Sequence, residues 1–191
     1  MSYTSSFWER DSFLTSYDLA IVGAGIVGLS SAFFYKKQHP QSRVVVLERG
    51  FLPQGASTRN AGFACVGSIG EHLADMEKES EENIKNRIKR RYDGLELLKK
   101  TLGEEAIGYD YCGGFEFFTS QEEYKKVAPE IDRFNGWMKE LVGEDEVYST
   151  DKIEGYPVIR NRLEGALHPG KMMQSLVQKV AGLGVEIKWN S

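Results

Sequence analysis

Residues 18–28 constrain the fold of this chain more than any other segment. Their sequence, Asp-Leu-Ala-Ile-Val-Gly-Ala-Gly-Ile-Val-Gly, predicts a buried strand, a glycine turn and then a helix over about residues 26–37. A second apolar run ends at Glu48, which follows Gly28 by 20 positions. A Gly-x-Gly-x-x-Gly pattern between a strand and a helix, with an acid at the next strand end, predicts a dinucleotide-binding α/β unit.

Each residue of this pattern has a separate expected task. Gly23 permits the tight turn, Gly25 lets backbone amides approach a pyrophosphate, and Gly28 lets the helix pack closely on the strand. The helix N-terminus directs its amides and positive dipole end at the phosphates. Glu48 is expected to accept hydrogen bonds from ribose hydroxyls, and its charge disfavours a 2′-phosphate. The alternative is that the glycines serve packing only. The expected cofactor-binding residues here are Gly23, Ala24, Gly25, Ile26, Gly28, Glu48 and Arg49.

A second run of small and polar residues, 55–63, decides between dinucleotides. Ser57 or Thr58 is expected to N-cap a new helix, and the small residues allow close approach of a flat group. A nicotinamide enzyme does not need a second phosphate-facing turn at this point, whereas an extended FAD does. A capped helix start without a ligand is the alternative. The expected FAD-contacting residues of this run are Ala56, Ser57, Thr58, Arg59, Asn60, Ala61, Gly62 and Phe63.

Four segments, 6–9, 18–28, 55–63 and 165–169, occur in the order found in one enzyme family. The chain resembles the D-amino-acid oxidase/glycine oxidase superfamily of FAD-dependent oxidoreductases, and within it the γ-glutamylputrescine oxidase-like branch. The resemblance implies a Rossmann-like FAD-binding domain of the GR2 type with an inserted α+β substrate region. It also implies that residues 57–63 lie along the pyrophosphate and toward the isoalloxazine ring.

The resemblance further implies a discontinuous domain organisation. Residues 17–70 are expected to form the first part of the FAD-binding domain, 71–168 a helical junction with the substrate-domain insert, and 169–191 an incomplete second part. Family members continue after the strand equivalent to 185–189. The chain is therefore expected to be the truncated N-terminal half of a flavoenzyme, and a partner chain could supply the missing half. An expressed fragment, a split subunit and a truncated gene product remain open.

Between the two cofactor segments, hydrophobic spacing predicts helices over 71–102 and 121–142, with a kink or a break at Gly94. An aromatic run predicts a strand over about 111–119. Residues 143–162 are expected to form a looser stretch.

The last part of the chain predicts a return to the parallel sheet. A short strand at 165–169 is expected to lead into a helix over 170–183, which Gly184 ends, and a strand over 185–189 follows. His168 stands at the strand–helix junction and is a weak catalytic candidate. It could act as an acid or base, or bond the backbone of its own turn.

The two cysteines give no indication of a metal or redox site. The two cysteines, Cys65 and Cys112, lack metal or redox spacing, and Cys65 is expected to be a buried small residue. No metal site is predicted.

Composition excludes several classes of partner. The net charge of −4 implies no attraction to nucleic acid or to an anionic membrane. No apolar run approaches the length of a membrane span, and residues 1–16 lack an apolar signal core, so a cytoplasmic location is expected.

The resemblance implies the chemistry. FAD takes a hydride from a carbon bearing an amine, and oxygen or another acceptor reoxidises it, so the expected partner is a small-molecule amine, amino acid or hydroxy acid. The alternatives are a non-catalytic FAD-binding fragment, an FAD-dependent 2-hydroxy-acid oxidase or dehydrogenase, and a nicotinamide-dependent dehydrogenase, which the 55–63 run disfavours.

Overall fold

The computed structural model describes residues 4–14 and 16–191. The chain forms two units: residues 1–60 with 169–191, and residues 61–168 inserted between them. The insertion begins ten residues earlier than the predicted boundary at 70/71. The reason is that strand β3 (Phe63–Ala64) pairs antiparallel with β7 (Gly165–Ala166), which ties this segment to the inserted unit.

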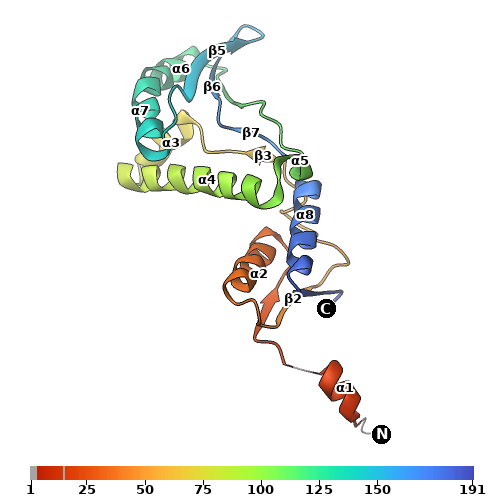
Figure 1. Ribbon diagram of the computed structural model, residues 1–191. Coiled ribbons are helices and arrows are strands. Elements are labelled where there is room, and N and C mark those ends of the chain that lie inside the picture. Colours follow the sequence, from red (N-terminus) through yellow and green to blue (C-terminus); the bar gives the residue numbers. More distant parts are fainter. Residues whose placement is uncertain (1–3, 15) are drawn as a thin grey trace. The chain divides into compact units, whose positions relative to one another are not determined.

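The first unit holds a three-stranded parallel sheet in the order β1-β2-β8 (Figure 1). Leu19 is opposite Val44, and Val45 is opposite Glu186. The predicted return of the chain to the parallel sheet is therefore confirmed. The elements of this unit are α1 (Phe7–Ser12), β1 (Leu19–Val22), α2 (Ile26–Gln38), β2 (Val44–Glu48), α8 (Pro169–Gly182) and β8 (Glu186–Trp189).

The central strand β2 organises the core of the first unit. Its first three residues are buried valines, as expected for a strand that is covered on both faces. Helices α2 and α8 contact each other, and each buries an apolar stripe. The stripe residues are Leu29, Ala32 and Phe33 on α2, and Met172, Met173, Leu176 and Val180 on α8. Gly184 has φ +79° just beyond α8, consistent with its predicted role in ending this helix.

The N-terminal segment 6–9 forms the start of α1. The side-chain hydroxyl of Ser6 accepts a hydrogen bond from the Glu9 N–H, and the Glu9 carboxylate accepts one from the Ser6 N–H at 2.7 Å. This reciprocal pair is a capping box, which satisfies two donors at the helix start. None of the residues of α1 is buried.

The second unit combines helices with a three-stranded antiparallel sheet in the order β4-β6-β5 (Figure 1). Besides β3 and β7, its elements are α3 (Ile69–Met76), α4 (Glu81–Leu102), α5 (Glu104–Ile107), β4 (Gly114–Phe117), α6 (Gln121–Val127), the 3₁₀ helix η1 (Ala128–Glu130), α7 (Ile131–Val142), β5 (Tyr148–Ile153) and β6 (Tyr156–Asn161).

Two helix predictions in this unit need correction. Residues 71–102 form two helices, because Ser80 caps a new helix by accepting a hydrogen bond from the Asn83 N–H. The predicted break at Gly94 does not occur, since α4 runs through this residue. An exposed glycine inside a long helix costs only about 1 kcal/mol relative to alanine, which a 22-residue helix tolerates. Residues 121–142 are interrupted by η1, where Pro129 stands.

The prediction of a looser stretch over residues 143–162 is wrong. Strands β5 and β6 form an antiparallel hairpin here, with Ile153 opposite Tyr156. The two turn residues, Glu154 and Gly155, have φ +50° and +86°, the backbone that a tight hairpin requires. The predicted strand over 111–119 is shorter than expected and is confined to β4.

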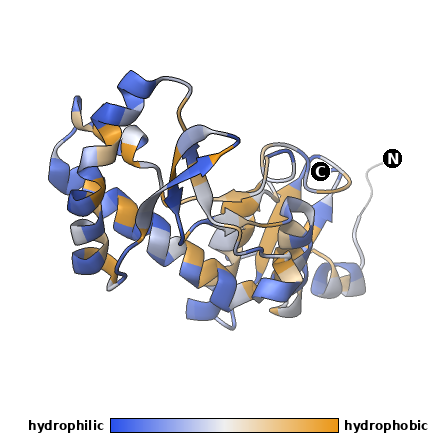
Figure 2. Cartoon of the chain, turned by 90° about the horizontal axis from the view of Figure 1, so that it is seen from above, coloured by the Kyte–Doolittle hydropathy of each residue, from blue (hydrophilic) through white to orange (hydrophobic). Residues whose placement is uncertain are grey.

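The core of the second unit gathers apolar residues from helices and strands. The helices show hydrophobic residues on one side and hydrophilic residues on the other (Figure 2). Helix α4 buries one stripe of residues, Ile84, Ile88, Leu95 and Leu102. The core cluster comprises Val66, Ile69, Ile84, Ile88, Phe118, Val127, Phe134, Trp137, Met138, Val147, Tyr148 and Ile159.

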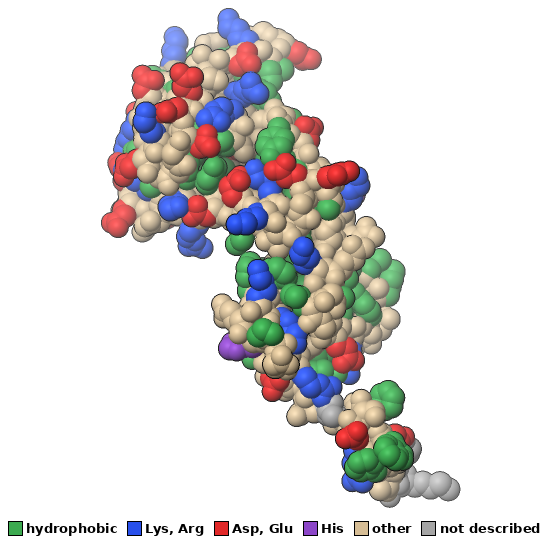
Figure 3. Space-filling view, in the orientation of Figure 1, with side chains coloured by type: hydrophobic (Ala, Val, Ile, Leu, Met, Phe, Trp, Pro, Cys, Tyr) green, Lys and Arg blue, Asp and Glu red, His purple; other side chains and the backbone are tan. Residues whose placement is uncertain are grey.

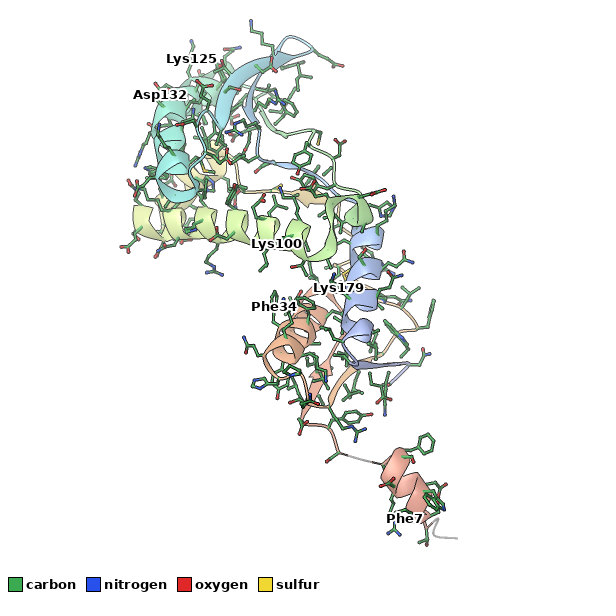
Figure 4. All side chains as sticks on the ribbon, in the orientation of Figure 1. Phe7, Phe34, Lys100, Lys125, Asp132 and Lys179 are labelled. Atoms are coloured by element: carbon green, nitrogen blue, oxygen red, sulfur yellow. The ribbon has the colours of Figure 1, made fainter. Side chains whose placement is uncertain are left out.

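Charged side chains of both signs alternate over the surface of the second unit (Figure 3). Several of them lie at helix ends, where their charge interacts favourably with the helix dipole. Examples are Asp132 in the first turn of α7, Lys100 in the last turn of α4 and Lys125 in the last turn of α6 (Figure 4). Across residues 4–14 and 16–191, no helix combines the length and the apolar character needed to cross a membrane.

Candidate functional site

The glycine turn between β1 and α2 has the geometry that the sequence predicts. Gly23 has φ +97°, a backbone conformation that favours glycine. Its N–H donates to the Leu47 carbonyl at 2.8 Å, which fixes the turn against the end of β2. The turn therefore lies at the carboxyl ends of two neighbouring parallel strands, where ligands of open α/β sheets bind.

Gly28 and Gly25 allow two different close approaches. A Cβ atom on Gly28 would lie 2.0 Å from the Gly23 carbonyl oxygen, so any side chain there would push the helix off the turn. A Cβ atom on Gly25 would lie 3.2 Å from the Ser57 hydroxyl oxygen. The missing side chain at Gly28 lets the helix pack on the turn. The missing side chain at Gly25 lets the 55–60 loop approach the start of α2.

The N-terminus of α2 presents backbone donors. Gly25 is the N-cap residue and supplies no side-chain cap. Within the described chain, the N–H groups of Gly25, Val27 and Gly28 have no acceptor, whereas the Ile26 N–H donates to the Ser57 hydroxyl at 3.0 Å. Unsatisfied first-turn N–H groups and the positive dipole end together form an anion site. This donor set fits a pyrophosphate.

Glu48 lies buried at the end of β2 and joins two loops. One carboxylate oxygen accepts from the Ala24 N–H at 2.8 Å, and the other accepts from the Gly50 N–H at 2.9 Å. The Ala24 hydrogen bond, followed by the one from Gly50, lowers the pKa of Glu48 below its usual value. The side chain is therefore ionised at neutral pH, and each oxygen keeps a lone pair for a further donor such as a hydroxyl.

The 55–60 loop forms turns, and no helix begins at Ser57 or Thr58, contrary to prediction. Their hydroxyls have other partners: Ser57 binds the start of α2, and Thr58 donates to the Pro53 carbonyl at 2.9 Å. The Asn60 amide donates to the Ala56 carbonyl at 2.9 Å and so closes the loop. Arg49 and Arg59 are exposed.

Ala61, Gly62 and Phe63 belong to the second unit. The Gly62 carbonyl accepts from the Leu167 N–H at 2.8 Å, and Phe63 pairs with Ala166 across β3 and β7. The side chain of Phe63 is exposed. The segment is thus held by its backbone, and the exposed ring of Phe63 is accessible to a ligand.

Two carboxylates that the sequence did not single out, the buried Glu164 and the half-buried Glu116, accept hydrogen bonds from the backbone that follows residue 65. One oxygen of Glu164 accepts from the Val66 N–H at 2.8 Å and from the Gly67 N–H at 2.7 Å. The carboxylate of Glu116 accepts from the Gly70 N–H. Burial raises the pKa of both carboxyl groups. Neither residue belongs to a recognisable motif, so only the fold reveals this support.

The other residues singled out from the sequence, His168 and Cys65, both lie at the surface. His168 is exposed, and its backbone N–H donates to the Ile107 carbonyl at 2.9 Å. Cys65 is exposed, which corrects the prediction that it is buried, because the side chain lies on the open side of the strand end while Ala64 and Val66 face inward. No group of side chains able to hold a metal ion occurs among the described residues.

The comparisons with known proteins agree with this geometry. A family model described as FAD dependent oxidoreductase matches residues 18–191. The chain is 30% identical over 112 residues to the mitochondrial L-2-hydroxyglutarate dehydrogenase of Dictyostelium discoideum, which covers 58% of this chain and 23% of that protein. It is 42% identical over 73 residues to the sarcosine oxidase subunit beta of Arthrobacter sp, which covers 38% of this chain and 18% of that protein.

Solved structures show the same fold. The structure of the L-amino acid deaminase from Proteus myxofaciens in complex with anthranilate has a TM-score of 0.66 and 17% sequence identity, and covers 92% of this chain and 38% of that one. The present chain therefore spans well under half the length of each of these three proteins.

Proposed function

Because this chain belongs to the family of FAD-dependent oxidoreductases, we propose that it is the FAD-binding portion of an enzyme that oxidises a C–N bond of an amino acid or amine. The observation that carries the proposal is the start of α2, where open backbone donors lie at the strand ends together with the buried, ionised Glu48. FAD, when bound, supplies the hydride acceptor, which oxygen or another acceptor reoxidises.

The residues of the chain have distinct proposed roles toward this cofactor. The first turn of α2 binds the pyrophosphate through backbone N–H groups, and Glu48 accepts hydrogen bonds from the ribose. The Ser57 hydroxyl accepts from Ile26 and still has its own proton to donate to a phosphate oxygen. We place residues 61–63 near the isoalloxazine ring. His168 stays a weak catalytic candidate.

The relatives support amine or amino-acid oxidation and also one alternative. Sarcosine oxidase and L-amino acid deaminase are named for amino-acid substrates, and the deaminase structure contains anthranilate, an aromatic carboxylate. The similarity to L-2-hydroxyglutarate dehydrogenase favours a second candidate function, oxidation of a 2-hydroxy acid. The two reactions share hydride transfer from a carbon next to a carboxylate. The γ-glutamylputrescine oxidase-like branch and a cytoplasmic location stay predictions.

The length of the chain supports a further proposal about its activity. Because it covers 38% of the deaminase chain, we propose that catalysis needs the remainder of the enzyme, on the same chain or on a partner chain. A fragment that binds FAD without turning over substrate is the corresponding alternative.

The first test is retention of FAD. The purified chain is mixed with FAD and desalted, and its visible absorbance spectrum is recorded. We expect a retained, protein-perturbed flavin spectrum. The Gly28→Ala variant should lose it, because the new Cβ would lie 2.0 Å from the Gly23 carbonyl oxygen. Gly182→Ala is the matched control, since a Cβ at Gly182 in α8 meets nothing within 4 Å.

The outcome separates the candidate functions. A colourless wild-type chain after desalting would contradict independent FAD binding by this portion. With the remainder of the enzyme present, anaerobic bleaching of the retained flavin by sarcosine supports C–N oxidation, whereas bleaching by 2-hydroxyglutarate alone supports the hydroxy-acid alternative.

A further inference from the structure

The antiparallel sheet of the second unit has one face turned toward the core and one turned outward. Glu116 of β4 is opposite Ile159 of β6 on the inner face. Phe115 is opposite Arg160, and Phe117 is opposite Val158. Since side chains alternate along a strand, these four residues and Tyr156 share the outer face.

The outer face carries exposed aromatic rings. Phe115, Phe117 and Tyr156 are 45%, 50% and 48% exposed, and the rings of Phe117 and Tyr156 lie 5.1 Å apart. Val158 lies on the same face but is completely buried, so the face is closely packed under its rings. Large exposed apolar side chains that gather in one place mark a binding surface more often than scattered ones. We call Phe115, Phe117, Tyr156 and Arg160 the aromatic face.

Arg160 supplies a single cation on this face. Its guanidinium lies 6.0 Å from the centre of the Phe115 ring and beside Gly113, and within the described chain it makes no hydrogen bond or ion pair. Arg162, two residues later, has the opposite surroundings: it pairs with Glu144 at 2.8 Å and donates to the Asp145 carbonyl. Asp151 is opposite Val158 on the neighbouring strand, and no ion pair joins it to Arg160.

An open guanidinium beside aromatic rings fits one class of ligand. Arginine binds carboxylates through two parallel hydrogen bonds in a fixed planar geometry. Aromatic rings pair with a second ring in stacked or edge-to-face arrangements. A free phosphate would leave the rings uncovered, and a neutral aromatic molecule would leave the guanidinium unpaired.

We propose that the aromatic face binds an aromatic carboxylate, with the carboxylate on Arg160 and the ring on Phe115, Phe117 and Tyr156. The inference rests on the proposed function, because it narrows the substrate of that enzyme to an acid with an aromatic side chain. Arg160 is then a specificity-determining residue that lies outside the cofactor segments.

The test uses benzoate as the probe and the complete 191-residue chain, labelled with ¹⁵N. Benzoate is titrated while backbone amide chemical shifts are followed. We expect shifts in β4 and β6 that saturate at millimolar benzoate. Benzyl alcohol, which lacks the charge, and acetate, which lacks the ring, should each bind at least about tenfold more weakly, because a charge-assisted pair and ring contacts each contribute to affinity.

Two variants make the test specific. Arg160→Gln should weaken benzoate binding by about tenfold or more, the loss expected for one hydrogen-bonded charge pair. Arg90→Gln is the matched control, because Arg90 is also exposed and has no ion pair within the described chain. It should bind benzoate like the wild type. Both positions are at the surface, so neither change threatens folding.

Three results would overturn the inference: no saturable shifts in β4 and β6 of the wild type, equal benzoate affinity in Arg160→Gln, or shifts of the same amides with protein concentration alone. The last would assign the face to a second copy of this chain. Failure of the proposed function is seen separately, because FAD binding moves the amides of residues 23–28 in the same spectra.

Discussion

His72 is a buried histidine with an unusual environment in the second unit. Its ring is completely buried on α3 and stacks 5.7 Å from Phe134. Neither ring nitrogen has a hydrogen-bond partner among residues 4–14 and 16–191. Burial without a compensating acceptor disfavours the charged ring and lowers the pKa of His72 to about 4.

This pKa predicts how stability depends on pH. Between pH 6.5 and 4 the unfolded chain binds a proton at His72 that the folded chain does not bind, so acidification over this window destabilises the fold. The loss is about 3 kcal/mol at most, from about 1.36 kcal/mol for each pKa unit. In the His72→Phe variant, the free energy of unfolding should fall less than in the wild type as the pH is lowered from 6.5 to 4. Urea unfolding at several pH values, followed by Trp137 fluorescence in a Trp8→Phe/Trp189→Phe background, measures it.

The comparison with a second histidine controls for general acid effects. His39→Gln, at an exposed position, should keep the wild-type dependence on pH. Glu164 and Glu116 act in the opposite direction, because a raised carboxyl pKa makes the fold more stable below the unfolded pKa and less stable as the pH rises. Both carboxylates are present in wild type and variant, so the difference between the two isolates His72. Parallel pH curves for wild type and His72→Phe would contradict the assignment.

At the scale of the element, α4 gives the clearest prediction. Gly94 lies inside this helix with an exposed surface, and a Cβ there would meet no atom within 4 Å. Gly94→Ala should raise the free energy of unfolding by about 0.5–1 kcal/mol, because alanine has the higher helix propensity and restricts the unfolded chain. Chemical denaturation measures the gain.

A glycine of the neighbouring helix provides the matched case. Gly136 lies in α7, and a Cβ on it is equally unobstructed. Gly136→Ala should therefore give a similar gain, whereas alanine at Gly143, just beyond α7 with φ +76°, should destabilise. A loss of stability in Gly94→Ala would mean that α4 bends at this residue, as the sequence had predicted.

At the scale of the whole molecule, the two units predict two unfolding transitions. The first unit contains the residues proposed to bind the pyrophosphate and ribose of FAD, together with Trp189, and the second contains Trp137. FAD at about 100 times its Kd should stabilise the first unit by about 2.7 kcal/mol, and the second unit, which contributes residues 61–63 to the proposed site, by less. Denaturation with FAD, in variants that keep one tryptophan each, measures the two shifts. Equal shifts at both tryptophans would show that the chain unfolds as one cooperative unit.

The sequence by itself determined the cofactor segment. A strand, a glycine turn and a helix follow from local chemistry, because only glycine tolerates the φ of Gly23 and the close approach at Gly28. The carboxylate of Glu48 could be placed at the same sheet edge for the same reason: neighbouring parallel strands end together.

Only the tertiary structure decided the rest. The 55–60 loop binds α2 instead of starting a helix, since the hydroxyl of Ser57 finds a donor 31 residues away. Strands β5 and β6 were not predicted from the sequence. A hairpin is stabilised by strand pairing and by the core beneath it more than by the composition of each strand. The support from Glu164 to Val66 and Gly67 spans nearly 100 residues, and no local pattern encodes such a contact. Burial and long-range pairing depend on the whole chain, whereas backbone conformation at a glycine depends on one residue.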